Sequence, residues 1–371
     1  MDVRAATGHE RPIPDPTDPT LAPRFLKLAD LAVDDPLDLP QVAFGHRLRF
    51  LVEVDQPAVI VSQVQRSGGT LISQLLDGHS ELHVHPHELR IGHPKKHDWP
   101  VLDLDAEADA LFAVLSEQTP LQHAQEGFKK IGHVEEAANP DYQALMRPFI
   151  FHQPLQAEIF RRLVARRRPV TRRQALDAYV TSYFNAWLDY QGLYKGAPRY
   201  WAGFVPRLFA SLANQDAFAA DYPDGRIITP VRDPASWYAS ARLHSPGYAD
   251  PEAAIGLWLQ ANEAILSGLE RRPDMILLVE HARVVSDTPG AMQAVARFLG
   301  VGFEPALLVP TFNGIPVTSN SSFGARYGVD PASADRSDRL EPEIRGLIES
   351  RTAAVQGRLR AAAAAHVARY G

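Results

Sequence analysis

The chain has 371 residues, of which 45% are hydrophobic and 22% are charged, and its formal net charge at pH 7 is −6. These proportions are typical of a soluble globular protein of one or two domains, and the negative net charge argues against a nucleic-acid-binding protein. The chain has no cysteine, which excludes disulfides, thiolate catalysis and cysteine-based metal sites.

Residues 1–23 are rich in proline and small polar residues, and they are expected to form a flexible N-terminal arm. The remaining residues, 24–371, are expected to form a single domain. The N-terminus lacks the apolar core of a signal peptide, and no apolar run is long enough to span a bilayer. A cytoplasmic enzyme without a membrane span is therefore expected.

The stretch from residue 58 to residue 76, AVIVSQVQRSGGTLISQLL, predicts a strand, a short glycine-rich turn and a helix. Such a turn directs backbone N–H groups and a helix dipole at an anion. Arg66 adds a guanidinium group, which is always positively charged and can donate two parallel hydrogen bonds, and Ser67 and Thr70 add hydroxyl donors. The turn is therefore interpreted as a cradle for phosphate or sulfate, the alternative being a tight turn whose glycines serve only packing.

The next segment is rich in histidine, and His83, His85 and His87 alternate as they would on one face of a strand. Two or three imidazoles on one face can ligate zinc. Solvated or hydrogen-bonded histidines are the commoner outcome, and no metal is expected here.

Residues 90–198 are expected to be a mainly helical insertion. A helical stretch runs from Glu158 to Gln191 with an interruption at Pro169, and 171-TRRQ-174 has the pattern of a capping box. Arginines are concentrated between Arg161 and Arg173. This run is interpreted as a solvated helix surface, and the alternative is a patch that steers an anionic acceptor or cosubstrate.

The second half of the chain alternates strand and helix patterns. Strands are predicted at 226–232 and 275–280, and helices from about Pro234, from about Asp287 to Leu299, and from 341 to 368. The alternation predicts an α/β protein with a parallel sheet between two helical layers.

A second arginine lies at the predicted end of the 226–232 strand. Arg232 is followed by Asp233-Pro234, and Ser240 stands eight residues after it. An arginine at the carboxyl end of a strand can bind a phosphate with both arms of its fork, and Ser240, two turns along the next helix, can reach the same group. The alternative is a surface arginine beside a helix cap.

The first motif does not match the nucleotide-triphosphate loop, because no lysine precedes Thr70 and the earlier glycine is missing. Arg66-Ser67-Gly68-Gly69-Thr70-Leu71 instead resembles the 5′-phosphosulfate loop of sulfotransferases that use 3′-phosphoadenosine 5′-phosphosulfate (PAPS). The motif departs from the family by having Gly69 where threonine is usual, which removes a hydroxyl donor. Arg232 and Ser240 resemble the family's 3′-phosphate site, and residues 278–300 and 318–324 resemble later family segments.

The resemblance, which is closest to bacterial and to tyrosylprotein or carbohydrate sulfotransferases, implies a P-loop NTPase-like sulfotransferase fold. The implied reaction is in-line transfer of a sulfuryl group from PAPS to a hydroxyl or amine of an acceptor (a carbohydrate, lipid, peptide or small molecule), with 3′-phosphoadenosine 5′-phosphate (PAP) as product. Glu88 or His87 is the implied base, Glu88 being favoured, although Glu88 pairing with Arg90 is an alternative. Arg66 is expected to stabilise the leaving phosphate.

By the same resemblance, the cosubstrate is expected to bind to Arg66, Ser67, Gly68, Gly69, Thr70, Arg232 and Ser240. The 90–198 insertion is expected to bind the acceptor. Two rival functions remain open, namely a P-loop-type nucleotide-dependent phosphotransferase and a non-catalytic nucleotide-binding relative.

Overall fold

The computed structural model describes residues 39–92, 95, 98–116, 151–317 and 328–371. The predicted N-terminal arm, the 318–324 segment and part of the 90–198 insertion lie outside the described residues. Within the described ranges no helix combines the length and the apolar character needed to cross a bilayer.

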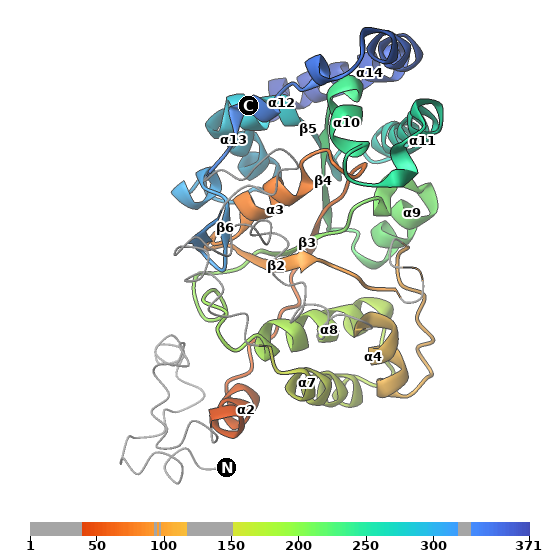
Figure 1. Ribbon diagram of the computed structural model, residues 1–371. Helices are drawn as coiled ribbons and strands as arrows, with labels where there is room; N and C mark the ends of the chain where they lie inside the picture. The colour runs from red at the N-terminus through yellow and green to blue at the C-terminus, as the bar shows by residue number, and fades with distance from the viewer. Residues whose placement is uncertain (1–38, 93–94, 96–97, 117–150, 318–327) are drawn as a thin grey trace.

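A five-stranded parallel sheet forms the centre of the protein (Figure 1). Its strands are β1 (Ala58–Val61), β2 (Leu82–Glu88), β3 (Tyr200–Phe204), β4 (Arg226–Val231) and β5 (Ile276–Glu280). They lie in the order β2-β3-β1-β4-β5. The predicted parallel α/β fold is confirmed, and so are the strands predicted at the start of the 58–76 stretch, at 226–232 and at 275–280.

Helices cover both faces of the sheet. Their bounds in the described residues are α2 (Leu39–Arg49), α3 (Gly69–Leu76), α4 (Ala108–Ser116), α7 (Gln153–Arg166), α8 (Arg172–Ala186), α9 (Leu212–Asp221), α10 (Pro234–Ala241), α11 (Pro251–Arg271), α12 (His281–Ser286), α13 (Thr288–Leu299) and α14 (Pro342–Tyr370). Side chains of β1 alternate between the two faces: Val59 and Val61 pack with α3 and α13, whereas Ala58 and Ile60 pack with α7, α8 and α11. This alternation gives the three layers that the sequence predicted.

Strand β3 was not predicted from the sequence. Its five residues, YWAGF, are all buried, because the strand lies between β1 and β2 in the middle of the sheet. A strand buried on both faces has no polar–apolar alternation, and a run this short cannot be told from a buried piece of helix. The missed strand matters for the site, since it separates the 58–76 motif from the histidine-rich strand.

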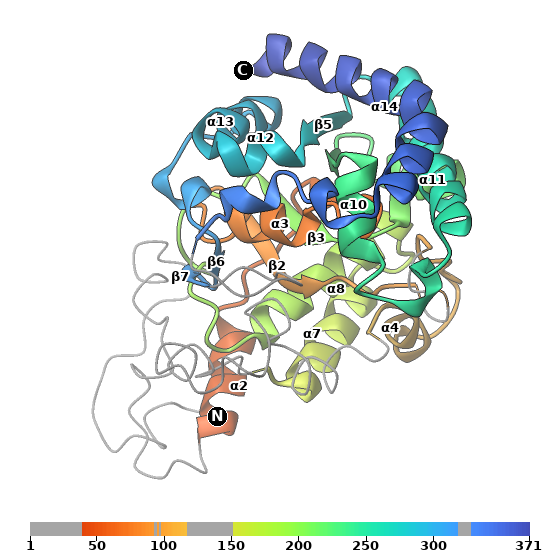
Figure 2. The ribbon, with the colours of Figure 1, turned by 45° about the horizontal axis from the view of Figure 1, so that its top comes forward.

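The C-terminal helix covers one of the two edges of the sheet. Figure 2 shows α14 passing over α10 and α11 towards α13, and the helix also packs against β5, the edge strand on that side. Because the outer amides of an edge strand lack a neighbouring strand, they need another partner. The backbone N–H of Leu278 donates to Nδ1 of His366 in α14 at 2.9 Å.

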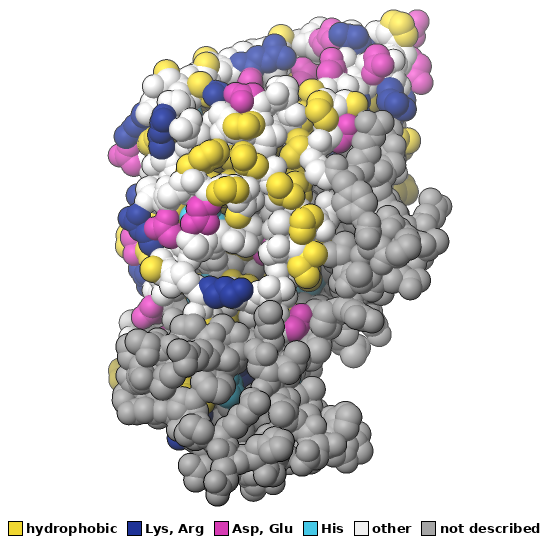
Figure 3. Space-filling model, turned by 90° about the vertical axis from the view of Figure 1, so that its left-hand side faces the viewer, with side chains coloured by type: hydrophobic (Ala, Val, Ile, Leu, Met, Phe, Trp, Pro, Cys, Tyr) yellow, Lys and Arg dark blue, Asp and Glu magenta, His cyan; other side chains and the backbone are white. Residues whose placement is uncertain are grey.

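A short hairpin, β6 (Thr311–Phe312) and β7 (Ile315–Pro316), follows α13. Three large hydrophobic side chains are exposed in this part of the chain, Phe303, Val309 and Ile315, at 45%, 41% and 40%. Figure 3 views the side of the molecule on which the hairpin lies, and hydrophobic side chains gather on that face. The hairpin itself is anchored, since Asp77 at the end of α3 accepts from the Thr311 hydroxyl at 2.7 Å.

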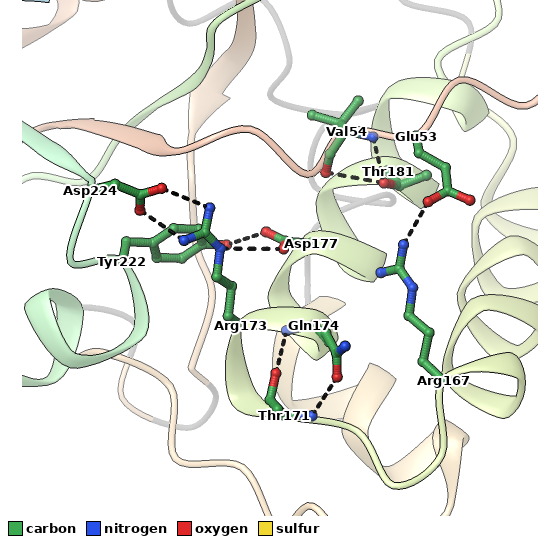
Figure 4. Close-up of polar contacts among 10 residues, drawn as sticks. All are labelled: Glu53, Val54, Arg167, Thr171, Arg173, Gln174, Asp177, Thr181, Tyr222 and Asp224. Atoms are coloured by element: carbon green, nitrogen blue, oxygen red, sulfur yellow. Dashed lines mark hydrogen bonds and ion pairs between the residues drawn. The ribbon is translucent and has the colours of Figure 1, made fainter.

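Most of the arginines between Arg161 and Arg173 form ion pairs with carboxylates on the same surface. Arg167 pairs with Glu53 at 2.7 Å, and Arg173 pairs with Asp224 at 2.8 Å and with Asp177 at 3.6 Å (Figure 4). The other arginines of the run bind Asp109, Glu158, Glu53, Asp221 and the backbone carbonyls of Leu104, Ala106 and Pro100. These contacts favour the interpretation as a helix surface. The capping box at Thr171 and Gln174 is confirmed as the start of α8.

Asp177 in α8 is a buried carboxyl of this network. Burial raises its pKa to about 7, against the lowering effects of the Tyr222 hydroxyl, which donates to it at 2.8 Å, and of Arg173. Because the pKa is higher in the folded than in the unfolded chain, the resulting stabilisation is complete below about pH 4 and is lost as the pH rises through about 7.

We therefore expect Asp177→Asn to remove a pH dependence. Between about pH 4 and pH 7 the wild type should lose up to about 1.4 kcal/mol of unfolding free energy per pH unit relative to the variant, whose amide still accepts from Tyr222. Urea unfolding of both proteins at pH 5, 6, 7 and 8 measures the difference. Parallel stability curves would contradict the raised pKa.

Candidate functional site

The candidate site lies at the carboxyl ends of β1, β4 and β5, where the 65–70 loop enters α3. The backbone of the loop is tightly folded: Arg66 and Gly68 both have positive φ, 68° and 98°. The first helical hydrogen bond runs from the Ile72 N–H to the Gly68 carbonyl at 3.1 Å, so the N–H groups of residues 69–71 precede the helical ladder. Gly68 stands at the N-cap and has no side chain to cap them, which leaves this turn suited to an anion.

The unusual Gly69 has a local cause. A Cβ at this position would lie 2.3 Å from Nε2 and 2.4 Å from Oε1 of Gln63, and 2.5 Å from the ring of Phe204. Gln63 is 3% exposed and lies two residues after the end of β1. Its carboxamide and the Phe204 ring therefore fill the space that a threonine side chain would need.

The structure brings the two arginine motifs together. Nε of Arg66 donates to the Ser240 hydroxyl at 3.4 Å, and one terminal nitrogen of Arg232 donates to the backbone carbonyl of Arg66 at 3.0 Å. Nε of Arg232 donates to the Ser236 hydroxyl at 3.2 Å. Residues 166 positions apart in the sequence thus share one hydrogen-bonded group. The sequence did not single out Ser236, which is fully buried.

A third arginine, Arg336, was missed by sequence reasoning. Its backbone N–H donates to the Ser236 hydroxyl at 3.1 Å, and its guanidinium lies 3.4 Å from the Asp330 carboxylate. Arg232 also donates to the carbonyl of Ser333, in the same C-terminal segment, at 3.1 Å. No sequence pattern around Arg336 distinguishes it from the other arginines of this part of the chain.

These three arginines, Arg66, Arg232 and Arg336, form what we call the arginine cluster. Burial, followed by the charges of Arg336 and Arg66, lowers the pKa of Arg232 to about 10. Burial and the charge of Arg336 lower the pKa of Arg66. Because like charges are held close together away from water, the cluster has a strong electrostatic preference for an anion.

A buried histidine lies next to the loop. His281 is the first residue of α12 and is 6% exposed. A Cβ on Gly68 would lie 2.4 Å from its Cδ2 and 3.3 Å from its Nε2. Burial, with the charges of Arg232 and Arg336, lowers the pKa of His281 to about 3, so its ring is neutral at physiological pH. Gly68 is thus required both by its positive φ and by the imidazole next to it.

His87 and Glu88, the two candidate bases, point to opposite faces of the sheet. The ring of His87 lies 5.6 Å from Phe312, on the side of α8. Glu88 follows it by one residue and pairs in register with Phe204, whose side chain belongs to the core on the α3 side. By strand alternation Glu88 faces the side of the 65–70 loop. Its carboxylate is 42% exposed and lies 3.9 Å from Arg90, the pairing that was the alternative interpretation.

The three alternating histidines share one face, as predicted, but aromatic rings surround them. His83 lies 3.1 Å from the Tyr190 hydroxyl, and the ring of His85 lies 4.3 Å from that of Tyr183. Among the described residues no group of three or more potential ligands is placed to hold a metal ion. The packing accounts for these histidines as part of the interface between β2 and α8.

The parallel sheet and the arginine cluster at its carboxyl edge define an α/β protein with an anion cradle at a strand–loop–helix turn. A family model described as the sulfotransferase family matches residues 57–305. The chain belongs to this family, as the sequence motifs predicted.

Comparison with solved structures gives similar proteins at low sequence identity. The sulfotransferase domain of the Synechococcus PCC 7002 olefin synthase is 20% identical, with a TM-score of 0.46 over 81% of this chain and 96% of that chain. The sulfotransferase domain from the curacin biosynthetic pathway is 17% identical (TM-score 0.46, 80% and 98% covered). Sulfotransferase STF9 from Mycobacterium avium is 16% identical (TM-score 0.35, 82% and 83% covered). A comparison with curated proteins gives no match.

The contact between Gly68 and His281 gives a stability prediction. Gly68→Ala forces a side chain into left-handed backbone and against the imidazole, and we expect a loss of about 1–3 kcal/mol of unfolding free energy. Urea unfolding measures it. Gly256→Ala in α11 is the matched control, since Gly256 is exposed and no atom lies within 4 Å of the added Cβ. The control should gain about 0.5–1 kcal/mol, and similar effects of the two changes would refute the strain at Gly68.

Proposed function

We propose that the protein transfers the sulfuryl group of PAPS to a hydroxyl or amine of an acceptor, with PAP as the product. The observation that most supports this proposal is the direct contact between the two arginine motifs. The side chain of Arg66 donates a hydrogen bond to the Ser240 hydroxyl, and Arg232 donates one to the backbone carbonyl of Arg66. A nucleotide with phosphate groups at both its 3′ and 5′ ends carries enough negative charge to satisfy such a cluster. Membership of the sulfotransferase family supports the same reaction.

In this proposal the 65–70 loop binds the 5′-phosphosulfate. The N–H groups of Gly69 and Thr70 and the hydroxyls of Ser67 and Thr70 donate to its oxygens, and Gly68 allows the close approach of the backbone. Arg232 and Ser240 bind the 3′-phosphate. Arg66 stands between them and neutralises the charge that grows on the bridging oxygen as the sulfur–oxygen bond breaks.

Glu88 is the general base that we favour. The acceptor oxygen attacks sulfur from the side opposite the leaving phosphate, so the base has to lie across a gap from the loop. Glu88 ends β2, two strands away from β1, a separation of about 10 Å, and it faces the same side of the sheet as α3. His87 points to the opposite face, which argues against it as the base.

The proposed acceptor carries a hydroxyl or amine and belongs to the carbohydrate, lipid, peptide or small-molecule classes named above. The reaction needs no metal, because the donor is already activated and the arginine cluster supplies the positive charge.

Two other functions make different predictions. A P-loop-type phosphotransferase needs ATP with Mg²⁺ and a lysine before Thr70, where this chain has Gly69. A non-catalytic relative would bind the nucleotide and have no turnover to lose when Glu88 is replaced.

The cosubstrate is tested by ligand-dependent thermal stability. PAP at a hundred times its dissociation constant should add about 2.7 kcal/mol of stability, whereas ATP, ADP and inorganic sulfate should add much less. Arg232→Ala should weaken the binding of PAP far more than that of adenosine 5′-phosphosulfate, which lacks the 3′-phosphate. Arg351→Ala, at an exposed ion pair with Glu252, is the control and should change neither. Stabilisation by ATP but not by PAP would overturn the proposal.

The base is tested by two separate substitutions. Glu88→Gln keeps the shape of the side chain but cannot accept the proton, so kcat should fall by about 10²–10⁴-fold while PAP affinity stays the same. His87→Gln should reduce kcat much less. Transfer of ³⁵S from labelled PAPS to an accepted phenol or sugar measures both, and PAP titration measures affinity. Full turnover by Glu88→Gln would exclude Glu88 as the base.

A further inference from the structure

His281 is a buried polar side chain next to the loop that the proposed mechanism does not use. It follows β5 directly, and the edge of its ring that carries Cδ2 and Nε2 faces Gly68. Helix α12 also packs against the short turn of residues 331–333, whose Ser333 carbonyl accepts from Arg232. His281 therefore lies between the 65–70 loop and the segment that carries Arg336.

The hydrogen bonding of the ring indicates where its proton lies. Nδ1 of His281 is buried and has no hydrogen-bond partner in the part of the chain that the structure describes. An N–H at this position would be an unsatisfied buried donor, which is rarer and less favourable than an unsatisfied acceptor. The neutral ring therefore carries its proton on Nε2, the nitrogen on the edge that faces the loop.

The charge state of the ring suits this location. Burial and the neighbouring Arg232 and Arg336 keep the imidazole neutral, because the lowered pKa lies far below physiological pH. A neutral N–H can donate to an anion without adding another positive charge to the arginine cluster. The cluster already holds three guanidinium groups close together, and a fourth cation would increase their repulsion.

We infer that His281 is a further cosubstrate-binding residue, which donates a hydrogen bond from Nε2 to the 5′-phosphate end of the nucleotide held by the 65–70 loop. The inference rests on the proposed function, since it assumes a nucleotide with a 5′-phosphate at this loop. It assigns to His281 a contact with the 5′ end and none with the 3′-phosphate.

The test compares two nucleotides and two substitutions by calorimetric titration. His281→Leu should weaken PAP binding by roughly tenfold to a hundredfold, the loss expected for one hydrogen bond to a charged group. Its affinity for adenosine 3′-monophosphate, which lacks the 5′-phosphate, should be unchanged. His281→Gln should retain most of the PAP affinity, because its amide nitrogen is about as far from the backbone as Nε2 of histidine. Equal losses for both nucleotides, or no loss for PAP, would overturn the inference.

A second measurement does not depend on the variants folding well. Nitrogen-15 NMR of the wild type should show a neutral histidine with its proton on Nε2, whose N–H signal shifts when PAP is added but not when adenosine 3′-monophosphate is added. The signal is assigned by its loss in His281→Gln. A proton on Nδ1, or a signal that does not respond to PAP, would contradict the assignment.

Different results would disprove the proposed function and the role of His281. If the wild type binds ATP but not PAP, the proposed function is wrong and the inference falls with it. If the wild type binds PAP and His281→Leu, shown by its unfolding temperature to be folded, binds PAP equally well, only the role of His281 is wrong.

Discussion

The repulsion among three guanidinium groups, two of them buried and that of Arg66 partly buried, is the constraint on which the site depends. Burial and the charge of Arg336 lower the pKa of both Arg66 and Arg232, and the charge of Arg66 lowers that of Arg232 further, yet folding holds the three groups together. The contacts that hold them include neutral groups: the hydroxyls of Ser236 and Ser240 and the carbonyl of Arg66. These neutral groups fix the geometry without adding negative charge, whereas Arg336 is also paired with the carboxylate of Asp330 at 3.4 Å.

The fold supplies these groups from three separate parts of the chain. The carboxyl ends of neighbouring parallel strands meet at one edge, so β1 and β4 bring Arg66 and Arg232 together, and β5 delivers His281 beside them. Arg336 comes from the segment before α14, the helix that also covers the edge of β5. The same helix therefore closes the sheet and fixes the position of the chain segment that completes the arginine cluster.

Much of this arrangement could be predicted from the sequence, because Arg66 and Arg232 each follow an apolar run and precede a helix start. The remaining features depend on tertiary packing. Strand β3 is short and buried on both faces, and so it has no alternation to detect. Arg336 lies in an irregular segment, where position is set by tertiary contacts such as those with Ser236 and Asp330. The choice between His87 and Glu88 depends on which face each side chain takes in a strand whose register shifts between Val84 and Glu88. Counting residues from Arg66 along the sequence does not show which face of the sheet each of these two side chains takes.

The carboxamide of Gln63 in the place of a side chain at position 69 has a consequence for the evolution of this loop. A larger residue at 69 would have to displace the amide of Gln63 and the ring of Phe204, and a smaller residue at 63 would leave a void beside Gly69. The two positions should therefore vary together among relatives, with glycine at 69 wherever a long side chain stands at 63. Such a pairing would mark a branch of the family in which a polar side chain has moved from the loop to the residues that link β1 to it.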